Sequence, residues 1–143
     1  MAARELTPVD LDRISTITYS CAIFQAPRSH YAGGIITFSG RYRPGSAGFS
    51  DALFIKWKID QFCDIDEPAR IYGLVVDFRE LDYEWGEDLG VPAARLRRGK
   101  MPVLSVVTPQ ARAAYAYCIE DAELREDFDT TVDEVANALS QMK

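Results

Sequence analysis

Acidic and aromatic residues alternate in one short segment of this chain, from Asp82 to Asp88. Carboxylates placed close together bind hard cations such as Mg²⁺ or Ca²⁺, or act in general acid–base catalysis. Aromatic side chains inside an acidic rim are instead typical of a surface that binds another protein. A third interpretation is a solvated loop whose aromatic rings fold back onto the core. The candidate residues for a protein-binding surface are Tyr83, Glu84, Trp85, Glu87 and Asp88.

The acidic residues of this region follow no recognisable metal-binding pattern. Ten acids and two arginines lie between Asp60 and Gly90, a local net charge of −8 against −6 for the whole chain. Their spacing matches no calcium loop. A metal-dependent hydrolase built on Asp77, Asp82 and Glu84 stays open as an alternative, but it lacks a convergent base. We therefore expect no metal ion, no other cofactor and no catalytic residues.

The cysteines and the histidine argue against two further kinds of chemistry. His30 is the only histidine, and it lies in the stretch from Pro27 to Gly34, which predicts a turn. A nucleophilic cysteine needs a nearby base and a tetrahedral zinc site needs four ligands, so both are disfavoured. An odd number of cysteines in apolar stretches predicts buried thiols in the reducing cytoplasm. The three cysteines are Cys21, Cys63 and Cys118.

Length and composition limit the class of protein. The chain has 143 residues, of which 48% are hydrophobic and 27% charged, as in a globular domain. Its net charge of −6 would repel a polyphosphate, so we expect no nucleic acid as partner. No run approaches the roughly 20 apolar residues of a membrane span, so we expect no membrane association either. The first ten residues contain acids and a proline where a signal peptide has its apolar core.

Four segments have the composition of strands, and they are 14–25, 35–42, 71–78 and 101–107. Because only a turn separates the first two, we expect them to form a hairpin. The segment 71–78 is a continuous apolar run, which is typical of a strand buried on both faces. This segment is therefore the predicted central strand.

Helices are predicted over four segments, which are 51–63, 91–98, 109–119 and 131–139. Ser50 is the predicted N-cap of the first, and Thr108 followed by Pro109 opens the third. Thr131 and Glu134 have the spacing of a capping box at the start of the last helix. A further strand or turn is expected near Phe128, just before that helix.

This order of elements predicts an α/β fold with a single mixed, largely parallel sheet. The sheet begins with an N-terminal hairpin, and the helices pack on it. No repeat or linker divides the chain, so residues 1–143 form one expected domain. Residues 1–12 are expected to be flexible and 14–141 to form the folded part.

The element order and the segment from Val75 to Gly90 resemble the STAS domain of sulphate transporters and anti-sigma-factor antagonists. In that family a hydrophobic strand ends in Asp, a short loop contains an aromatic residue, and Asp-Ser-Ser-Gly-Leu-Gly opens a helix. Asp77 would match the strand-end Asp, Tyr83 the aromatic residue, and Leu89 with Gly90 the Leu-Gly pair. The resemblance implies a STAS-like fold.

The resemblance extends in element order from about Ser15 to Leu139 and implies a non-catalytic protein-binding domain in signalling. Where regulated members of the family have a phosphorylated Ser or Thr, this chain has Gly86 and Glu87. The charge of Glu87 at a helix start would partly replace the phosphate, so an unswitched version is expected. Another protein is the expected partner, and a homo-oligomer stays open.

An alternative of a different class is a bacterial immunity or antitoxin-like protein. Such a chain neutralises a toxin by covering a basic active site with its own acidic surface. The acidic composition is compatible with both hypotheses and does not separate them.

Overall fold

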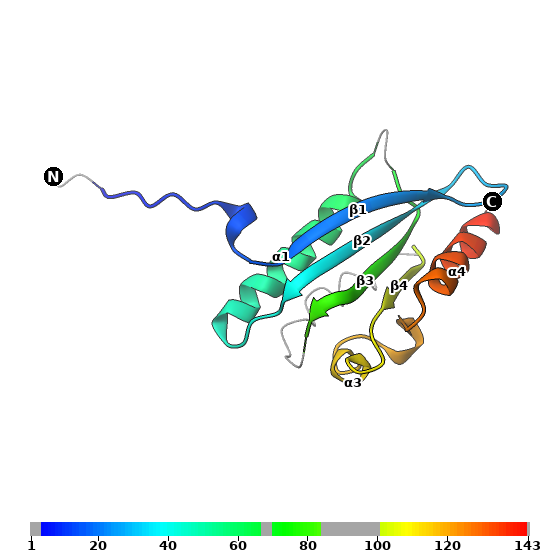
Figure 1. Ribbon diagram of the computed structural model, residues 1–143. Helices are drawn as coiled ribbons and strands as arrows, with labels where there is room; N and C mark the ends of the chain where they lie inside the picture. Colours follow the sequence, from blue (N-terminus) through cyan, green and yellow to red (C-terminus); the bar gives the residue numbers. More distant parts are fainter. Residues whose placement is uncertain (1–3, 67–69, 84–100, 143) are drawn as a thin grey trace.

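The strands of this protein form one mixed sheet. The computed structural model describes residues 4–66, 70–83 and 101–142. Five strands lie side by side in the order β1-β2-β3-β4-β5, with β1 and β5 at the edges (Figure 1). β1 and β2 pair antiparallel, and β2 to β5 pair parallel. The strand bounds are β1 Thr18–Gln25, β2 Ala32–Arg41, β3 Gly73–Asp82, β4 Val103–Val106 and β5 Leu124–Arg125.

In the described residues, three α-helices and two 3-10 turns precede, connect or follow the strands. β1 and β2 are joined by a short turn, which an antiparallel pair allows. α1 connects β2 to β3 and returns the chain, so that β3 pairs parallel to β2. The bounds are α1 Ser46–Cys63, α3 Arg112–Tyr115, α4 Phe128–Ser140, η1 Leu11–Arg13 and η2 Asp121–Glu123.

α1 covers one face of the sheet. Side chains alternate between the two faces along a strand, so Leu74, Val76 and Phe78 of β3 point to the same side. They belong to one apolar cluster with Ile55 and Ile59 of α1. All five are at most 1% exposed. Full burial of such a side chain stabilises a fold by roughly 1.5–3 kcal/mol, so this cluster is the main core.

α4 packs on the opposite face. Val75 points away from the first cluster and lies with Val106 of β4 in a second, smaller apolar cluster. Val135 and Leu139 of α4 complete that cluster, and both are at most 1% exposed. The central strand β3 is thus covered on both faces, as its continuous apolar sequence predicted.

The C-terminal end of α4 lies beside the turn of the β1–β2 hairpin (Figure 1). The Ser140 hydroxyl donates to the carbonyl of Pro27 at 2.6 Å. The Ser29 hydroxyl donates to the carbonyl of Leu139 at 3.3 Å. Two side-chain hydrogen bonds therefore attach the hairpin to a helix that is distant in sequence.

A glycine allows α1 to approach β2 closely. A Cβ atom at Gly34 would lie 2.7 Å from the ring of Phe62 in α1 and 2.8 Å from Ile71. These distances are too short for real carbon contacts, so the packing of Phe62 requires glycine at this position.

The structure confirms the predicted fold class, a single mixed and largely parallel sheet with an N-terminal hairpin. The predicted start of the first helix at Ser50 is wrong, because α1 begins at Ser46. Its N-cap is Gly45, which has φ +68° and ψ −148°, a conformation open essentially only to glycine. Ser50 therefore lies inside the helix. The predicted helix 91–98 lies outside the described residues.

Predictions about the two later helices are also wrong in part. The third helix was expected over 109–119, but only Arg112–Tyr115 is α-helical. The predicted N-cap at Thr108 is also wrong, because the N-cap of α3 is Ala111, which has no side-chain cap. The Thr108 Oγ1 instead accepts from the amide of Ala111 at 3.2 Å, in the turn before the helix. The capping box at Thr131 is wrong, because the N-cap of α4 is Asp127, whose side chain accepts from the amide of Thr130.

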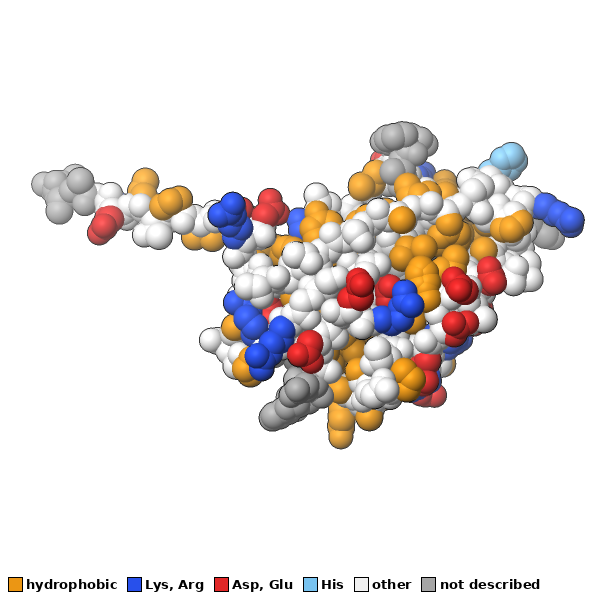
Figure 2. All heavy atoms as spheres, in the orientation of Figure 1, with side chains coloured by type: hydrophobic (Ala, Val, Ile, Leu, Met, Phe, Trp, Pro, Cys, Tyr) orange, Lys and Arg blue, Asp and Glu red, His pale blue; other side chains and the backbone are white. Residues whose placement is uncertain are grey.

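The N-terminal residues form an exposed arm that extends away from the sheet (Figure 1). Apolar side chains are exposed along this arm, including Leu6 at 82% and Val9 at 71% (Figure 2). In the described part of the chain, the helices are too short or too polar to cross a lipid bilayer.

Candidate functional site: an apolar groove beside the edge strand

The structure describes one of the five residues predicted to bind a partner. Tyr83 is only 3% exposed, and its ring stacks on Tyr115 at 4.5 Å between centroids. The ring of Tyr42 contacts Tyr83 edge-on at 5.0 Å. Tyr83 thus lies in the core, as in the alternative interpretation of an aromatic ring that folds back. The other four residues lie outside the described residues: Glu84, Trp85, Glu87 and Asp88.

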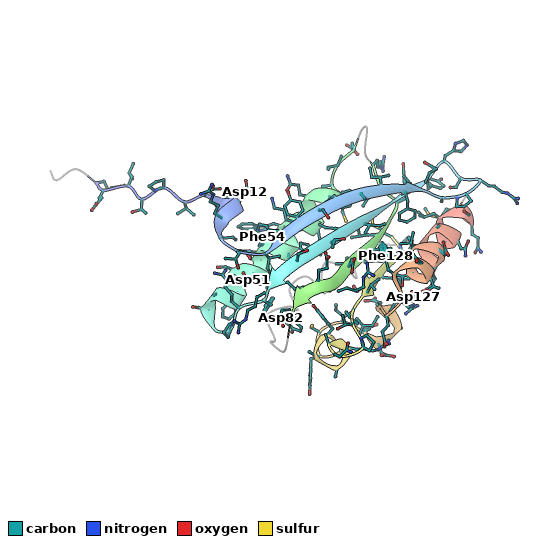
Figure 3. All side chains as sticks on the ribbon, viewed as in Figure 1. Asp12, Asp51, Phe54, Asp82, Asp127 and Phe128 are labelled. Carbon is teal, nitrogen blue, oxygen red and sulfur yellow. The ribbon has the colours of Figure 1, made fainter. Side chains whose placement is uncertain are left out.

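Of the carboxylates proposed for a hydrolase, Asp77 and Asp82 do not converge, and Glu84 lies outside the described residues. Asp77 is 2% exposed and accepts from Nε and Nη2 of Arg79, both at 2.9 Å. The Arg79 guanidinium also lies over the ring of Phe128, at the start of α4 (Figure 3). Asp82 lies five residues further along β3, about 16 Å away at the rise of a strand. Asp77 therefore has a structural role, which is to hold β3 against α4.

The buried aromatic cluster around Tyr115 offers no base. Burial, above all, raises the pKa of Tyr115 far above its ordinary value, so the phenol stays protonated. Burial likewise raises the pKa of Cys118, although a hydrogen bond with Tyr83 opposes the change. In the described residues, no group of three or more His, Cys, Asp and Glu side chains is placed to hold a metal ion.

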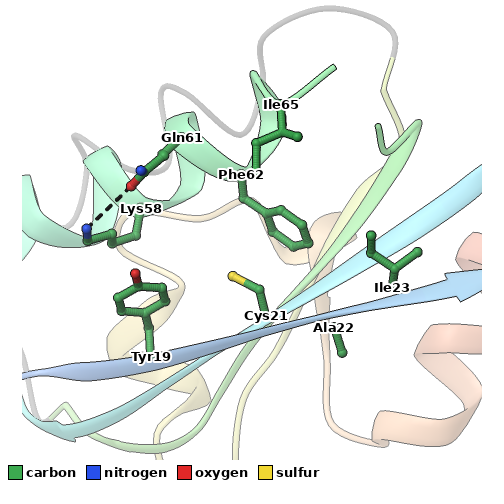
Figure 4. A pocket seen from close by; sticks show the side chains of 8 residues that line it. All are labelled: Tyr19, Cys21, Ala22, Ile23, Lys58, Gln61, Phe62 and Ile65. Atoms are coloured by element: carbon green, nitrogen blue, oxygen red, sulfur yellow. Dashed lines mark hydrogen bonds between the residues drawn. The ribbon is translucent and has the colours of Figure 1, made fainter. Parts of the chain in front are cut away.

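A groove of about 520 Å³ lies between β1 and α1 (Figure 4). We call it the edge groove, because β1 is an edge strand of the sheet. Its lining is mostly apolar, and three of its large apolar side chains are exposed, Tyr19 at 44%, Ile23 at 48% and Ile65 at 39%. The lining residues are Tyr19, Cys21, Ala22, Ile23, Lys58, Gln61, Phe62 and Ile65.

The spacing of these residues explains why they meet. Tyr19, Cys21 and Ile23 are two residues apart, so their side chains share one face of β1. Lys58 and Phe62 are four residues apart and therefore lie on one side of α1. The strand and the helix thus form the two walls of the edge groove (Figure 4).

One cation lies at the rim of the edge groove. The Lys58 ammonium contacts the carboxylate of Asp12 at 3.1 Å and the Gln61 side-chain oxygen at 3.4 Å. It also lies 5.0 Å from the ring centre of Tyr19. Burial alone would lower the pKa of Lys58, but the contacts with Asp12 and Tyr19 outweigh burial and raise it. Lys58 therefore stays protonated and is no general base near neutral pH.

Cys21 lies in the edge groove and is exposed, so the prediction of a buried thiol is wrong for this residue. None of the three cysteines forms a disulfide. Partial burial raises the pKa of Cys21, and the nearby Lys58 charge opposes this only in part. The thiol is therefore less reactive than that of an unperturbed cysteine.

The outer edge of β1 presents backbone groups that no other strand of the described residues pairs with. The amide of Ala26 donates to the carbonyl of Tyr31, opposite it in the hairpin. Because hydrogen-bonded residues alternate along an antiparallel pair, Tyr19, Cys21 and Ile23 point their N–H and C=O groups away from β2.

β1 also lacks the usual protection of an edge strand. Natural proteins block such edges with charges, prolines or bulges, because an open edge pairs with other chains. β1 contains no Asp, Glu, Lys, Arg or Pro, and every residue except Phe24 is exposed. The edge groove and the open backbone together form a surface for an extended apolar segment.

Sequence reasoning did not identify this surface. It assigned the segment 14–25 to a strand from its β-branched and aromatic residues, but composition does not tell an edge strand from a central one. The available signal was an uncharged strand at one end of the chain's strand order. That signal becomes informative only once the pairing partners of each strand are known.

Comparison of the chain with protein-family models, with curated proteins and with solved structures gives no match.

Proposed function

We propose that this chain is a non-catalytic protein-binding domain that accepts an extended segment of its partner at the outer edge of β1. The observation that supports this best is the uncharged, exposed edge strand beside an apolar groove. Main-chain hydrogen bonds to such an edge provide affinity, and pockets for alternate side chains provide specificity.

The composition of the edge groove supports binding rather than catalysis. Its ionisable groups are Tyr19, Cys21 and Lys58. Lys58 stays protonated beside Asp12, and the pKa of Cys21 is raised, so neither group is activated as a base or nucleophile. Apolar side chains of a bound strand would enter between Ile23 and Phe62.

The resemblance to STAS domains is compatible with this proposal, because anti-sigma-factor antagonists also act by binding other proteins. We retain the STAS-like assignment as part of the proposal. The segment that includes Trp85 and Glu87 is the second region that a partner would contact under that assignment.

The experiment compares four baits in the cell that naturally expresses the chain. The wild-type chain is cross-linked and purified in parallel with Ile23→Lys, Ser20→Lys and Trp85→Ala. Ile23→Lys places a charge on the groove face of β1. Ser20→Lys is the matched control, since Ser20 is also exposed but points to the other face of the strand.

A partner that is lost from Ile23→Lys and retained by Ser20→Lys is the expected result. Hydrogen exchange of the purified complex should then show slower exchange at the amides of Tyr19, Cys21 and Ile23. A partner retained by Ile23→Lys but lost from Trp85→Ala would assign binding to the segment around Trp85 and contradict the proposal.

A further inference from the structure

We infer that the segment bound at β1 is β1 of a second copy of this chain, so that two copies join their sheets about a two-fold axis at Cys21. The inference rests on the proposed function, because it names the occupant of the same edge. The product would be one continuous sheet across both copies, with β1 of each copy at its centre.

The backbone of β1 allows such a pairing. When two copies of β1 run antiparallel about an axis at Cys21, each Cys21 lies opposite its counterpart. Tyr19 of one copy then lies opposite Ile23 of the other. These are the residues whose N–H and C=O groups point away from β2. Each opposed pair would exchange two hydrogen bonds, which satisfies the backbone groups that the single chain leaves open.

The side chains favour this register over its neighbour. Tyr19 and Ile23 are the most exposed large apolar side chains of β1, at 44% and 48%. Cross-strand pairs of an aromatic and a β-branched residue are favourable, and the two-fold axis forms this pair twice. With the axis moved by one residue to Ala22, Tyr19 would lie opposite Gln25 and the pair would be lost.

The charges also fit a second copy. β1 has no ionised side chain, so two copies bring no like charges into register. The nearest cation, Lys58, is only 12% exposed and is already paired with Asp12. Two such edges can therefore pair their backbone groups with each other, without another protein.

The first experiment uses the natural thiol as a reporter of the register. Residues opposed in a hydrogen-bonded antiparallel pair have Cα atoms about 5.5 Å apart, within the range that a disulfide spans. Diamide accepts two electrons and two protons from two Cys21 thiols, so an intermolecular Cys21–Cys21 disulfide should form and be found by peptide mass spectrometry. The chain used is the wild type.

The control is the double variant Cys21→Ser, Ile23→Cys. In the inferred register two thiols at position 23 are four residues apart along the strand, about 13 Å, so diamide should not join them. A disulfide through position 23 that forms as readily as the one through Cys21 would overturn the register.

The second experiment measures association by sedimentation equilibrium in reducing buffer. The wild-type chain should approach twice its monomer mass as its concentration rises. Ile23→Lys should weaken association at least about tenfold, whereas Ser20→Lys should change it less than about threefold. Tyr19→Lys, at the opposed position, should act like Ile23→Lys. Circular dichroism of each variant checks that it is folded.

The outcomes separate this inference from the proposed function. A chain that stays monomeric at all concentrations overturns the inference, even if collisions produce some Cys21 disulfide. If that monomeric chain binds another protein and Ile23→Lys abolishes the binding, the result supports the proposed function without the inference. A dimer that Ile23→Lys leaves intact overturns the inference as well, because it would form through another surface.

Discussion

The guanidinium of Arg43 and the carboxylate of Asp51 form a partly buried ion pair, with Nη2 and Oδ1 2.7 Å apart. Asp51 lies in α1 and has no exposed side-chain surface, whereas Arg43 follows β2 and is 31% exposed (Figure 3). Nη2 of Arg43 also donates to the carbonyl of Ile14, and the Ser15 hydroxyl donates to Asp51. The pair therefore joins three segments, namely the residues before β1, the end of β2 and the first half of α1.

Asp51→Asn should destabilise the fold by about 2–4 kcal/mol. The amide is nearly the same size but has no charge to balance the partly buried Arg43, and removing one partner of such a pair is costly. Urea unfolding at pH 7 measures the loss. Glu134→Gln is the matched control, because its pair with Arg125 is about half exposed. An exposed pair contributes about 0–1 kcal/mol, so equal losses in both variants would contradict the structural role of Asp51.

The contribution of Asp51 should disappear at acid pH. Burial alone would raise the pKa of Asp51, but hydrogen bonds from Arg43 and Ser15 outweigh burial and lower it. A carboxyl whose folded pKa is lowered stabilises the protein above its unfolded pKa of about 3.9, and the effect is lost as pH falls through the folded pKa. The stability difference between wild type and Asp51→Asn should stay constant from about pH 7 to 5 and shrink below about pH 4. A difference that grows on acidification would contradict this.

Gly34→Ala should destabilise the fold by roughly 1–3 kcal/mol through overpacking against Phe62. Because Phe62 also lines the edge groove, any displacement of its ring should narrow the groove and weaken binding at β1. Gly33→Ala is the comparison, since its Cβ would meet Phe24, which is outside the lining of the groove. Thermal unfolding and sedimentation measure the two effects. Equal loss of binding in both variants would contradict the assignment of Phe62 to the groove wall.

Asp127→Ala should cost about 1 kcal/mol, because the amide of Thr130 loses its cap at the start of α4. Glu134→Ala should cost less, since Glu134 takes no part in capping and forms only an exposed pair with Arg125. Urea unfolding of both variants distinguishes the observed N-cap from the capping box suggested by Thr131 and Glu134. A larger loss of unfolding free energy in Glu134→Ala than in Asp127→Ala would support the capping box instead.

Association of two copies should strengthen as salt is added. Each chain has a net charge of −6, so two copies repel each other over distances longer than the Debye length, about 10 Å at 0.1 M salt. The interface itself contains no ion pair that salt would weaken, because β1 is uncharged. Sedimentation at about 20 and 300 mM sodium chloride tests this. Weaker association at high salt would show that ion pairs hold the copies together.

The sequence predicted the sheet better than the helix ends. The run from Ile71 to Phe78 is apolar because β3 is covered on both faces. Such a continuous apolar run can be recognised from the sequence alone. The start of α1 depends on the positive φ of Gly45. From residue type alone, a nearby serine such as Ser50 is an equally suitable N-cap. Thr131 lies buried inside the first turn of α4, where its hydroxyl donates to the carbonyl of Asp127, so it does not act as an N-cap.

The candidate site was harder to predict for a different reason. The sequence predicted a binding surface from charged and aromatic residues such as Tyr83. Local composition does not show which aromatic rings enter the core. The edge groove combines β1 with α1, so its walls come from segments about forty residues apart. The groove is open because β1 lies at the edge of the sheet. This edge position is known only when the pairing of all strands is known.

The two hydrogen bonds between the hairpin turn and the end of α4 close loops of more than one hundred residues. Loop closure grows costlier only slowly with length, but its cost must be met before such distant contacts stabilise the fold. The hairpin of β1 and β2 needs only contacts between neighbouring segments. We therefore expect the hairpin, and with it the outer edge of β1, to form before α4 docks.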